Sequence, residues 1–240
     1  MLKFVHGSED ILRVSDNQQA TDKKYRAIVL LGPPGSGKGT QGRNLGEVPG
    51  YWFVSMGEIL RSLDTKTQPG RQIQQHLHSG ELVPAKLVIS VWMQYVGDLS
   101  ATGFDPHRDV LVLGGLPRNI EQVELLRPHV RVERVIYLAC DDESLLSERI
   151  RGRDAGRQDD VIRHRFNVYR EQTAPLLDHY GGERATKVDA TNSPLRVLHE
   201  IVESLVTRET SHSMQAAAVT ARLADHSENL ITPTHKEREL

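Results

Sequence analysis

Residues 32–41 read Gly-Pro-Pro-Gly-Ser-Gly-Lys-Gly-Thr-Gln, between an apolar run at 27–31 and a helical pattern that begins at Lys38. Glycine lacks a Cβ atom, so this stretch can curl with successive N–H groups pointing inward. Those donors, together with the positive end of the following helix, form an anion site. Lys38 supplies a cation for the β- and γ-phosphates of a nucleotide. The pattern predicts a cradle for ATP phosphates made by Gly35, Ser36, Gly37, Lys38, Gly39 and Thr40.

Short apolar runs alternate with amphipathic stretches on either side of this loop. The expected strands lie at 27–31, 52–54, 110–113, 135–139 and 187–189, and most show no polar alternation. Such runs indicate strands that are buried on both faces of a parallel sheet. The expected helices lie at 38–45, 57–62, 72–78, 85–97, 121–126, 143–151, 161–177 and 194–206. We therefore predict an α/β fold with a doubly wound five-stranded parallel sheet of the P-loop nucleoside triphosphate hydrolase type.

Composition limits the kind of protein this can be. The 240 residues carry 30 basic and 32 acidic side chains, for a formal charge of −2, so we expect no nucleic-acid partner. No apolar stretch is long enough for a membrane helix, so we expect no membrane partner. The single cysteine, Cys140, fits a reducing compartment and a place in the core. We expect a cytoplasmic monomer with one domain at 26–207 and polar tails at 1–25 and 208–240.

The variant Gly37-Lys38-Gly39-Thr40-Gln41 resembles adenylate kinase and its nucleoside monophosphate kinase relatives of the short-lid type, and the likeness extends over about residues 26–206. The resemblance implies a Mg²⁺-dependent transfer of phosphate from ATP to a nucleoside monophosphate, with AMP as the leading acceptor. It also implies that Thr40 bonds a phosphate oxygen. Mg²⁺ would then be carried by ATP oxygens and water, with no direct protein ligand. The chain has no Cys or His cluster at the lid, so no zinc is expected.

The same resemblance assigns an acceptor-binding arm at 55–83. Arg61 would hold the monophosphate, and Arg118 would contact it from the segment that ends the third strand. Gln122 matches the glutamine that pairs with the adenine edge. The residues expected around AMP are Met56, Arg61, Glu81, Leu82, Val83, Gly115, Leu116, Pro117, Arg118, Gln122, Arg157 and Arg165.

A short lid is expected at 152–160, and arginines flank it. Arg149 and Arg153 are four residues apart, so they share one helical face and would reach the same polyphosphate of ATP. Asn192, after the last strand, would contact the adenine of ATP. The side chains expected to act in catalysis are Lys38, Arg118, Arg149, Arg153, Arg157 and Arg165. Such a set suits a loose, charge-spread transition state.

Several positions depart from the family pattern. Gly114 stands where relatives carry an aspartate that orients Mg²⁺-bound water, and Asp141 or Asp142 could substitute, although Asp142 also fits an ordinary helix start. Met56 replaces Thr or Ala, and Leu116 replaces an aromatic residue. The lid is minimal, and the next helix lacks about three residues, which rotates its arginine by about 60°. Arg163 is therefore an alternative to Arg165.

Two alternatives to an adenylate kinase remain open at this point. The acceptor could be UMP or CMP, because Met56 is unusual and Arg118-Asn119 is compatible with pyrimidine relatives, although Gln122 favours adenine. A catalytically weakened, nucleotide-binding regulatory protein would explain Gly114 and the shortened lid.

Overall fold

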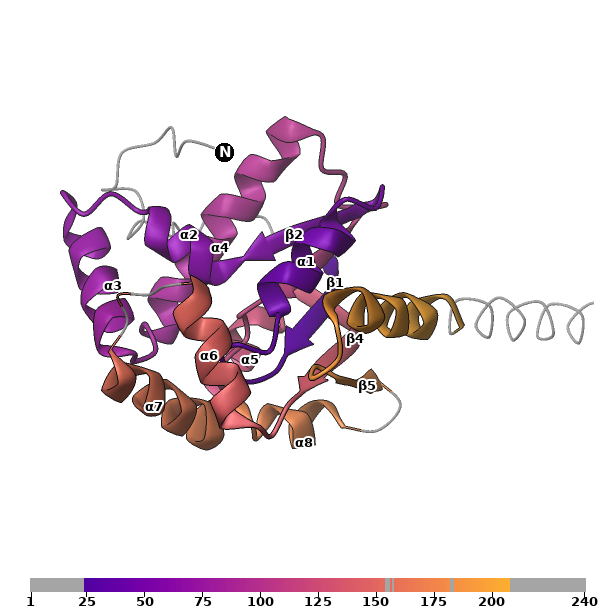
Figure 1. The fold of residues 1–240 in the computed structure, drawn as a ribbon. Coiled ribbons are helices and arrows are strands. Elements are labelled where there is room, and N and C mark those ends of the chain that lie inside the picture. The colour runs from indigo at the N-terminus through magenta and orange to yellow at the C-terminus, as the bar shows by residue number, and fades with distance from the viewer. Residues whose placement is uncertain (1–23, 154–155, 157, 182–183, 208–240) are drawn as a thin grey trace, which may run out of the picture. The chain divides into compact units, whose positions relative to one another are not determined.

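The computed structural model describes residues 24–153, 156, 158–181 and 184–207. Its centre is a sheet of five strands in the order β2-β3-β1-β4-β5 (Figure 1). Every pairing between neighbouring strands is parallel. The strands are β1 (Tyr25–Leu31), β2 (Tyr51–Ser55), β3 (Val110–Gly114), β4 (Val130–Ala139) and β5 (Ala185–Asp189). Each expected strand is present, and the predicted α/β fold class is confirmed.

Helices join the strands and cover both faces of the sheet. They are α1 (Lys38–Gly46), α2 (Met56–Ser62), α3 (Gln68–Ser79), α4 (Ala85–Leu99), η2 (Ser100–Thr102), α5 (Ile120–Leu126), α6 (Glu143–Arg153), α7 (Asp159–Val168), η3 (Tyr169–Thr173), α8 (Leu176–Tyr180) and a helix at 194–207. Strand β1 shows why the strands read as continuous apolar runs. Ala27, Val29 and Leu31 join a core cluster with residues of α4 and α5, while Ile28 and Leu30 point the other way and are equally buried.

One helix expectation is wrong. The stretch 161–177 was expected to be one helix, but it is divided into α7, the π-helical turn η3 and α8. In η3, the N–H of Ala174 donates to the carbonyl of Tyr169, five residues back, at 2.8 Å. Pro175 follows at once, and proline has no N–H to donate and crowds the carbonyl four residues before it, so the turn ahead of it widens. This turn brings Thr173 to the site described below.

The strand order places the phosphate loop at a switch point of the sheet. Strand β1 is flanked by β3 on one side and by β4 on the other, so the chain leaves the carboxyl end of β1 where the connections diverge. Loops at such a point enclose a crevice where ligands bind in open α/β sheets. The segments after β1 and after β3 therefore lie together at this edge.

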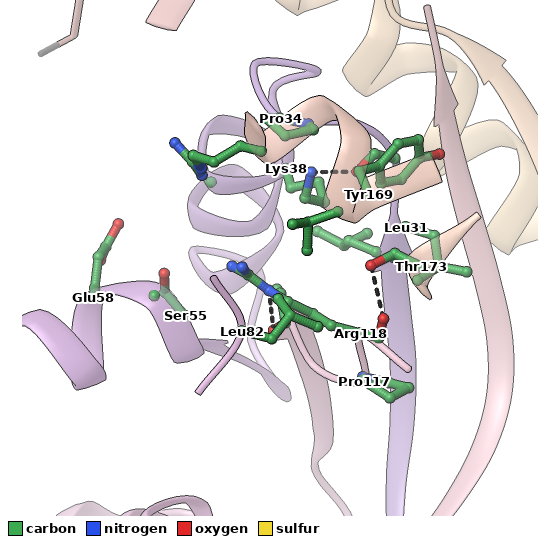
Figure 2. A pocket seen from close by; sticks show the side chains of 18 of the residues that line it. Leu31, Pro34, Lys38, Ser55, Glu58, Leu82, Pro117, Arg118, Tyr169 and Thr173 are labelled. Atoms are coloured by element: carbon green, nitrogen blue, oxygen red, sulfur yellow. Dashed lines mark hydrogen bonds between the residues drawn. The ribbon is translucent and has the colours of Figure 1, made fainter. Parts of the chain in front are cut away.

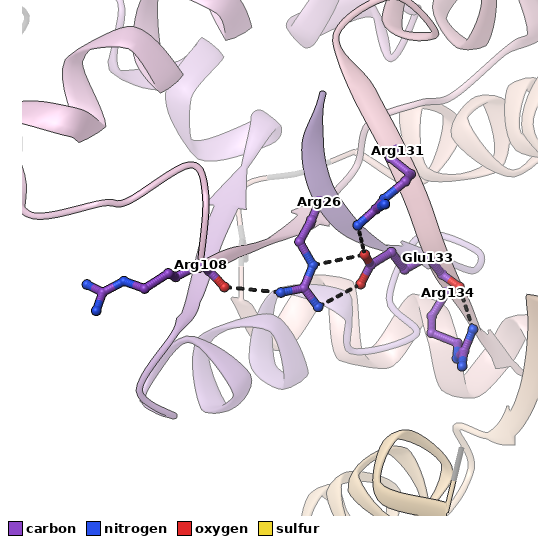
Figure 3. Close-up of polar contacts among 5 residues, drawn as sticks. All are labelled: Arg26, Arg108, Arg131, Glu133 and Arg134. Carbon is purple, nitrogen blue, oxygen red and sulfur yellow. Dashed lines mark hydrogen bonds and ion pairs between the residues drawn. The ribbon is translucent and has the colours of Figure 1, made fainter. Parts of the chain in front are cut away.

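The opposite edge of the sheet is fixed by a cluster of charged side chains around Glu133 (Figure 3). The register between β1 and β4 shifts there, because Ala27 pairs with Val132 and Ile28 pairs with Arg134. Arg26 donates to both oxygens of Glu133, at 2.9 and 3.1 Å, and Arg131 adds a bond of 2.8 Å. Burial alone would raise the pKa of Glu133, but the two guanidinium groups outweigh it and lower the pKa. The cluster thus ties together the amino ends of β1 and β4, far from the phosphate loop.

The chain divides into two units at Leu198 and His199, and the sheet with the helices up to α8 belongs to the first. The expected tails lie almost wholly outside the described residues. Within the described ranges, no helix has both the length and the apolar character needed to cross a membrane.

Leucines at two positions give a matched test of this core. Leu113 in β3 is fully buried, whereas Leu195 is 77% exposed. We expect Leu113→Ala to lower the free energy of unfolding by about 2–5 kcal/mol, because it leaves a cavity between packed layers. Leu195→Ala should change it by less than about 0.5 kcal/mol. Denaturant unfolding of the full chain measures both, and equal effects would contradict the assigned core.

Candidate functional site

The loop between β1 and α1 has the conformation that the sequence predicts. Gly32, Gly35 and Gly37 have φ values of 143°, 83° and 95°, a region that side-chain-bearing residues rarely adopt. Space also requires glycine at Gly35, because a Cβ atom there would lie 2.6 Å from the carbonyl oxygen of Leu146. Helix α1 begins without a side-chain cap. Its first N–H groups are therefore available to an anion at its positive end.

Lys38 is held by the loop's own carbonyl groups. Its Nζ atom donates to the oxygens of Gly32 and Pro33, at 2.6 and 2.8 Å, and lies 3.4 Å from the Ser36 hydroxyl. Burial lowers the pKa of Lys38 well below its usual value, and the positive charges of Arg118, Arg165 and Arg153 lower the pKa further. The lysine therefore sits where positive charge is already concentrated, which favours an anionic ligand.

These cations surround one cavity, which we call the central cavity (Figure 2). Of the described residues that line it, the basic ones are Lys38, Arg61, Arg118, Arg153 and Arg165 and the acidic one is Glu58. The basic residues come from α1, α2, the loop after β3, the end of α6 and the middle of α7. The fold thus brings segments that are distant in sequence to a single phosphate-sized opening.

Three hydrogen bonds fix the loop that carries Arg118. The Arg118 Nε donates to the carbonyl of Gly115 at 3.0 Å, and the Arg118 N–H donates to Gln122 Oε1 at 2.7 Å. Figure 2 shows the third bond, in which the Thr173 hydroxyl of η3 donates to the Arg118 carbonyl at 2.7 Å. Burial and the charge of Arg61 lower the pKa of Arg118. The guanidinium is therefore held in place without a carboxylate partner among these bonds.

A second cavity opens on the outer side of the phosphate loop, and we call it the loop-side cavity. It measures about 480 Å³. Its lining includes the predicted residues Gly35, Ser36, Gly37, Gly39, Thr40, Arg149, Arg153 and Asn192. Arg149 donates to the carbonyl of Ala190 at 2.7 Å, so its guanidinium is tied to the loop after β5. Gln41 fastens the same region, because its amide donates to the carbonyl of Pro194 at 2.9 Å.

A third cavity lies between α2, the strip 80–83 and the loop after β3, and we call it the arm-side cavity. Its lining includes Met56, Arg61, Glu81, Leu82, Val83, Gly115, Arg118, Gln122 and Arg165, all expected around the acceptor. The strip is packed against α7: His164 contacts Glu81 at 2.6 Å, and a Cβ atom at Gly80 would lie 3.0 Å from Arg165 Cγ. The remaining volume is about 50 Å³, far below the roughly 300 Å³ of ordinary ligand sites.

Other expected residues are placed as follows. Pro117 lines the central cavity, whereas Leu116 is buried in the core and lines none of the three cavities. Arg165 lines the central cavity, while Arg163 is exposed and lines none of the three. Arg157 lies outside the described residues. Arg151 pairs with Asp159 at 2.8 Å, which joins the end of α6 to the start of α7.

Asp142, one of the two acids considered as a substitute for the aspartate missing at position 114, has another role. Asp142 caps α6, because its Oδ1 accepts the N–H groups of Ser144 and Leu145 at 2.9 and 3.0 Å. This confirms the ordinary helix start. Among the described residues, no group of three or more His, Cys, Asp or Glu side chains could hold a metal ion.

Sequence reasoning missed two features of the site. Phe53 in β2 lines the central cavity beside Lys38 and Gly114, and Gln122 supports the Arg118 loop besides facing the arm-side cavity. Phe53 was not visible in a local pattern, because its setting depends on contact between separate segments. The bond from Arg118 to Gln122 joins residues only four positions apart, but it depends on the conformation of the loop between them. The glycines that surround Phe53 were the one available signal.

The lowered pKa of Lys38 predicts proton uptake when a polyphosphate binds. An anion raises the pKa of the lysine, so between its pKa in the free protein and its pKa in the complex the lysine gains a proton on binding. We expect uptake on ADP binding to grow as the pH rises through the lowered pKa of the free protein, well above pH 6, where phosphate groups with a pKa of about 6 no longer contribute. Calorimetry in buffers of different ionisation enthalpy measures it. Lys38→Arg, which stays protonated, should remove the uptake, and an uptake unchanged in that variant would contradict the assignment.

Comparison with known proteins agrees with this geometry. The family model described as adenylate kinase matches residues 30–185. An adenylate kinase of Mycolicibacterium vanbaalenii is 38% identical over 188 residues, which cover 74% of this chain and 98% of that protein. An adenylate kinase of Synechococcus sp. WH7803 is 37% identical over 191 residues, which cover 75% of this chain and 94% of that protein. The chain belongs to the adenylate kinase family.

Proposed function

We propose that this protein is an adenylate kinase, which catalyses reversible phosphoryl transfer from ATP to AMP to give two ADP. The observation that supports the proposal is that two further cavities each share lining residues with one cationic centre. The loop-side and arm-side cavities share Arg153, Arg165 and other residues with the central cavity, where Lys38 lies. Two nucleotides that occupy these two cavities would bring their phosphates together at Lys38.

The loop-side cavity is the donor site in this proposal. ATP would lay its adenosine against Arg149 and Asn192, and its phosphates would follow the N–H groups of 35–40 into the central cavity. The bond from Arg149 to Ala190 ties the guanidinium to the loop after β5, and a planar guanidinium can stack on an aromatic base. The short lid at 152–160, with Arg153 at its start and Arg157 within it, would close over the phosphates.

The arm-side cavity is the acceptor site. Arg61 and Arg118 would bind the monophosphate, while Gln122 faces the base among Met56, Leu82 and Val83. Because about 50 Å³ remains there, AMP must displace the arm at 55–83 from α7 before it enters. The contact between Glu81 and His164 then re-forms around bound AMP. Closure of this kind excludes water from the transferring phosphate.

Phosphoryl transfer requires that the two phosphate groups be correctly positioned and that cations stabilise the transferring group. The migrating group is a loose, metaphosphate-like species with charge on its outer oxygens, so fixed cations stabilise it more than they stabilise the reactants. Lys38, Arg118, Arg153 and Arg165 surround the place where the two phosphates would meet. Backbone carbonyls hold Lys38 and Arg118, and these neutral groups do not cancel the charge of the two side chains.

A panel of acceptors tests the proposal directly. Purified protein is assayed with ATP and, separately, AMP, UMP, CMP and GMP, with product detected by chromatography. We expect ADP from AMP at a rate well above that with the other three. Preferred transfer to UMP or CMP would assign a pyrimidine nucleotide kinase instead, and tight ATP binding without transfer would assign a nucleotide-binding regulator.

Two variants control this assay. Lys38→Ala should lower kcat by about 10²–10³, as expected for loss of one preorganised donor to the transition state. Arg163→Ala is the matched control, because Arg163 lies two residues from Arg165 and lines none of the three cavities. Arg165→Ala should impair transfer while Arg163→Ala leaves it near the wild-type rate, and the reverse order would show that the arginine roles are exchanged.

Base recognition by Gln122 can be separated from its support of Arg118. The Gln122 amide N–H can donate to N1 of adenine, whereas N1 of hypoxanthine is itself a donor, so we expect AMP to be preferred over IMP by about 10²-fold or more. In Gln122→Leu this preference should fall to within about tenfold, with a loss of about 1–3 kcal/mol in unfolding free energy from the unpaired Arg118 N–H.

Asn119→Ala is the control for Gln122→Leu. Asn119 caps α5 by accepting the N–H of Gln122 at 2.9 Å, so its loss should cost about 1 kcal/mol of stability and leave base preference unchanged. If Asn119→Ala removed the preference for AMP equally well, Gln122 would act only through the fold.

A further inference from the structure

Phe53 occupies a space that three glycines leave open. A Cβ atom at Gly42 would lie 2.0 Å from the Phe53 ring, and one at Gly46 would lie 2.9 Å from its Cβ. Gly42 and Gly46 are four residues apart on α1, so they share a face of that helix. The third glycine is Gly114, at the end of β3. The ring is half-buried and lines the central cavity together with Lys38 and Gly39.

Glycine is required at position 114 because a Cβ atom would clash with a neighbouring side chain, and not because the backbone has a positive φ angle. Its φ is not among the positive values found elsewhere in the chain. A Cβ atom there would lie 2.7 Å from Phe53 Cε2 and 3.0 Å from Cζ, closer than real Cβ contacts. A carboxylate at 114 and a phenyl ring at 53 therefore cannot coexist without a shift of one of them. The wall of the central cavity is therefore aromatic beside Gly114, the position at which the family resemblance implies an aspartate.

The remaining acidic side chain of the cavity already faces a cation. Glu58 Oε1 accepts from Arg43 Nη1 of α1 at 2.6 Å, and both side chains are about half exposed. Asp142 caps α6. The described residues of the central cavity thus offer five cationic groups and no carboxylate outside an ion pair. This donor set does not fit a hydrated Mg²⁺ held by the protein, because such an ion is bound through carboxylates.

We propose that Phe53, seated among Gly42, Gly46 and Gly114, is a positioning residue that replaces a metal-orienting carboxylate with an apolar wall, so that nucleotide binding to this protein does not depend on a divalent metal. The inference rests on the proposed use of the cavity by ATP phosphates. Any Mg²⁺ enters as part of the nucleotide complex, and the chain's own cations balance the phosphate charge.

This proposal predicts which form of ATP, metal-free or bound to Mg²⁺, the protein binds more tightly. A divalent ion on ATP reduces the negative charge that the phosphates present, and a cavity with a cationic excess attracts the more negative ligand at least as strongly. A carboxylate that bonds to metal-bound water would reverse this preference. The ratio of the two affinities therefore reports whether the site contains such a carboxylate.

Calorimetric titration of the full chain with ATP, once with excess Mg²⁺ and once with EDTA, tests the inference without turnover, since no acceptor is present. We expect metal-free ATP to bind as tightly as the Mg²⁺ complex or more tightly. Binding of the Mg²⁺ complex more than about tenfold tighter would overturn the proposal. Glu58→Gln should leave the ratio unchanged. A ratio that moved by about tenfold in this variant would identify Glu58 as the metal's partner and would also overturn it.

A double-mutant comparison tests the role of Phe53 itself. Gly114→Asp alone should lower the thermal midpoint, because the new side chain meets the ring. Phe53→Ala/Gly114→Asp relieves the crowding and should bind the Mg²⁺ complex about tenfold better, relative to metal-free ATP, than Phe53→Ala does. An equal ratio in those two variants would contradict the assignment of Phe53. Circular dichroism checks folding, and the wild-type and Glu58→Gln titrations remain decisive if the double variant fails to fold.

These titrations are independent of the acceptor panel. Transfer to AMP together with a strong preference for the Mg²⁺ complex in binding would remove this inference and leave the proposed function intact. Metal-independent binding of ATP without transfer to any monophosphate would do the opposite.

Discussion

Repulsion among cations that converge on one small cavity is the constraint on which the rest of this structure depends. Lys38 and the arginines at 61, 118, 153 and 165 line that cavity. Burial and the nearby arginines lower the pKa of Lys38, and burial and Arg61 lower the pKa of Arg118. Backbone carbonyls accept hydrogen bonds from Lys38 and Arg118, and also from the neighbouring Arg149. Arg26, Arg43 and Arg151 have acidic partners, whereas the groups bonded to Lys38 and Arg118 are neutral. A polyphosphate bound in the central cavity would neutralise the positive charge of these side chains.

Such an arrangement costs stability, so the frame around it has to be rigid. The sheet provides rigidity through strands buried on both faces, and β3 is buried at each of its five residues. The loop after β3 is then fixed from three directions, by Gly115, by Gln122 and by Thr173. Thr173 reaches the loop because η3 widens the chain ahead of Pro175. Irregular π-turns are frequent at functional sites. Here the turn places the Thr173 hydroxyl within hydrogen-bond distance of the Arg118 carbonyl.

Local patterns were sufficient to predict the sheet, the phosphate loop and most of the cationic side chains. Glycine spacing, apolar runs and the four-residue spacing of Arg149 and Arg153 are properties of short segments, whereas Arg165 was named from the family resemblance. All three arginines line the cavities described above. Phe53 could not be predicted, because its setting depends on glycines in α1 and β3 that meet only in the fold. The division of 161–177 was missed because the helical periodicity of the stretch outweighed Pro175. The bond from Arg118 to Gln122 is local, but it depends on a loop conformation that the sequence does not specify.

The cationic cavity also bears on how quickly ligands arrive. A concave surface lined by one sign of charge focuses the electric field outward, and it raises the encounter rate with oppositely charged small molecules. The carbonyls that hold Lys38 are neutral, so its charge can attract anions that diffuse toward the cavity before any contact is made. Screening shortens the range of this steering to about 8 Å at physiological ionic strength. The capture of nucleotides by this chain is therefore a process whose speed is set partly by the salt of its surroundings.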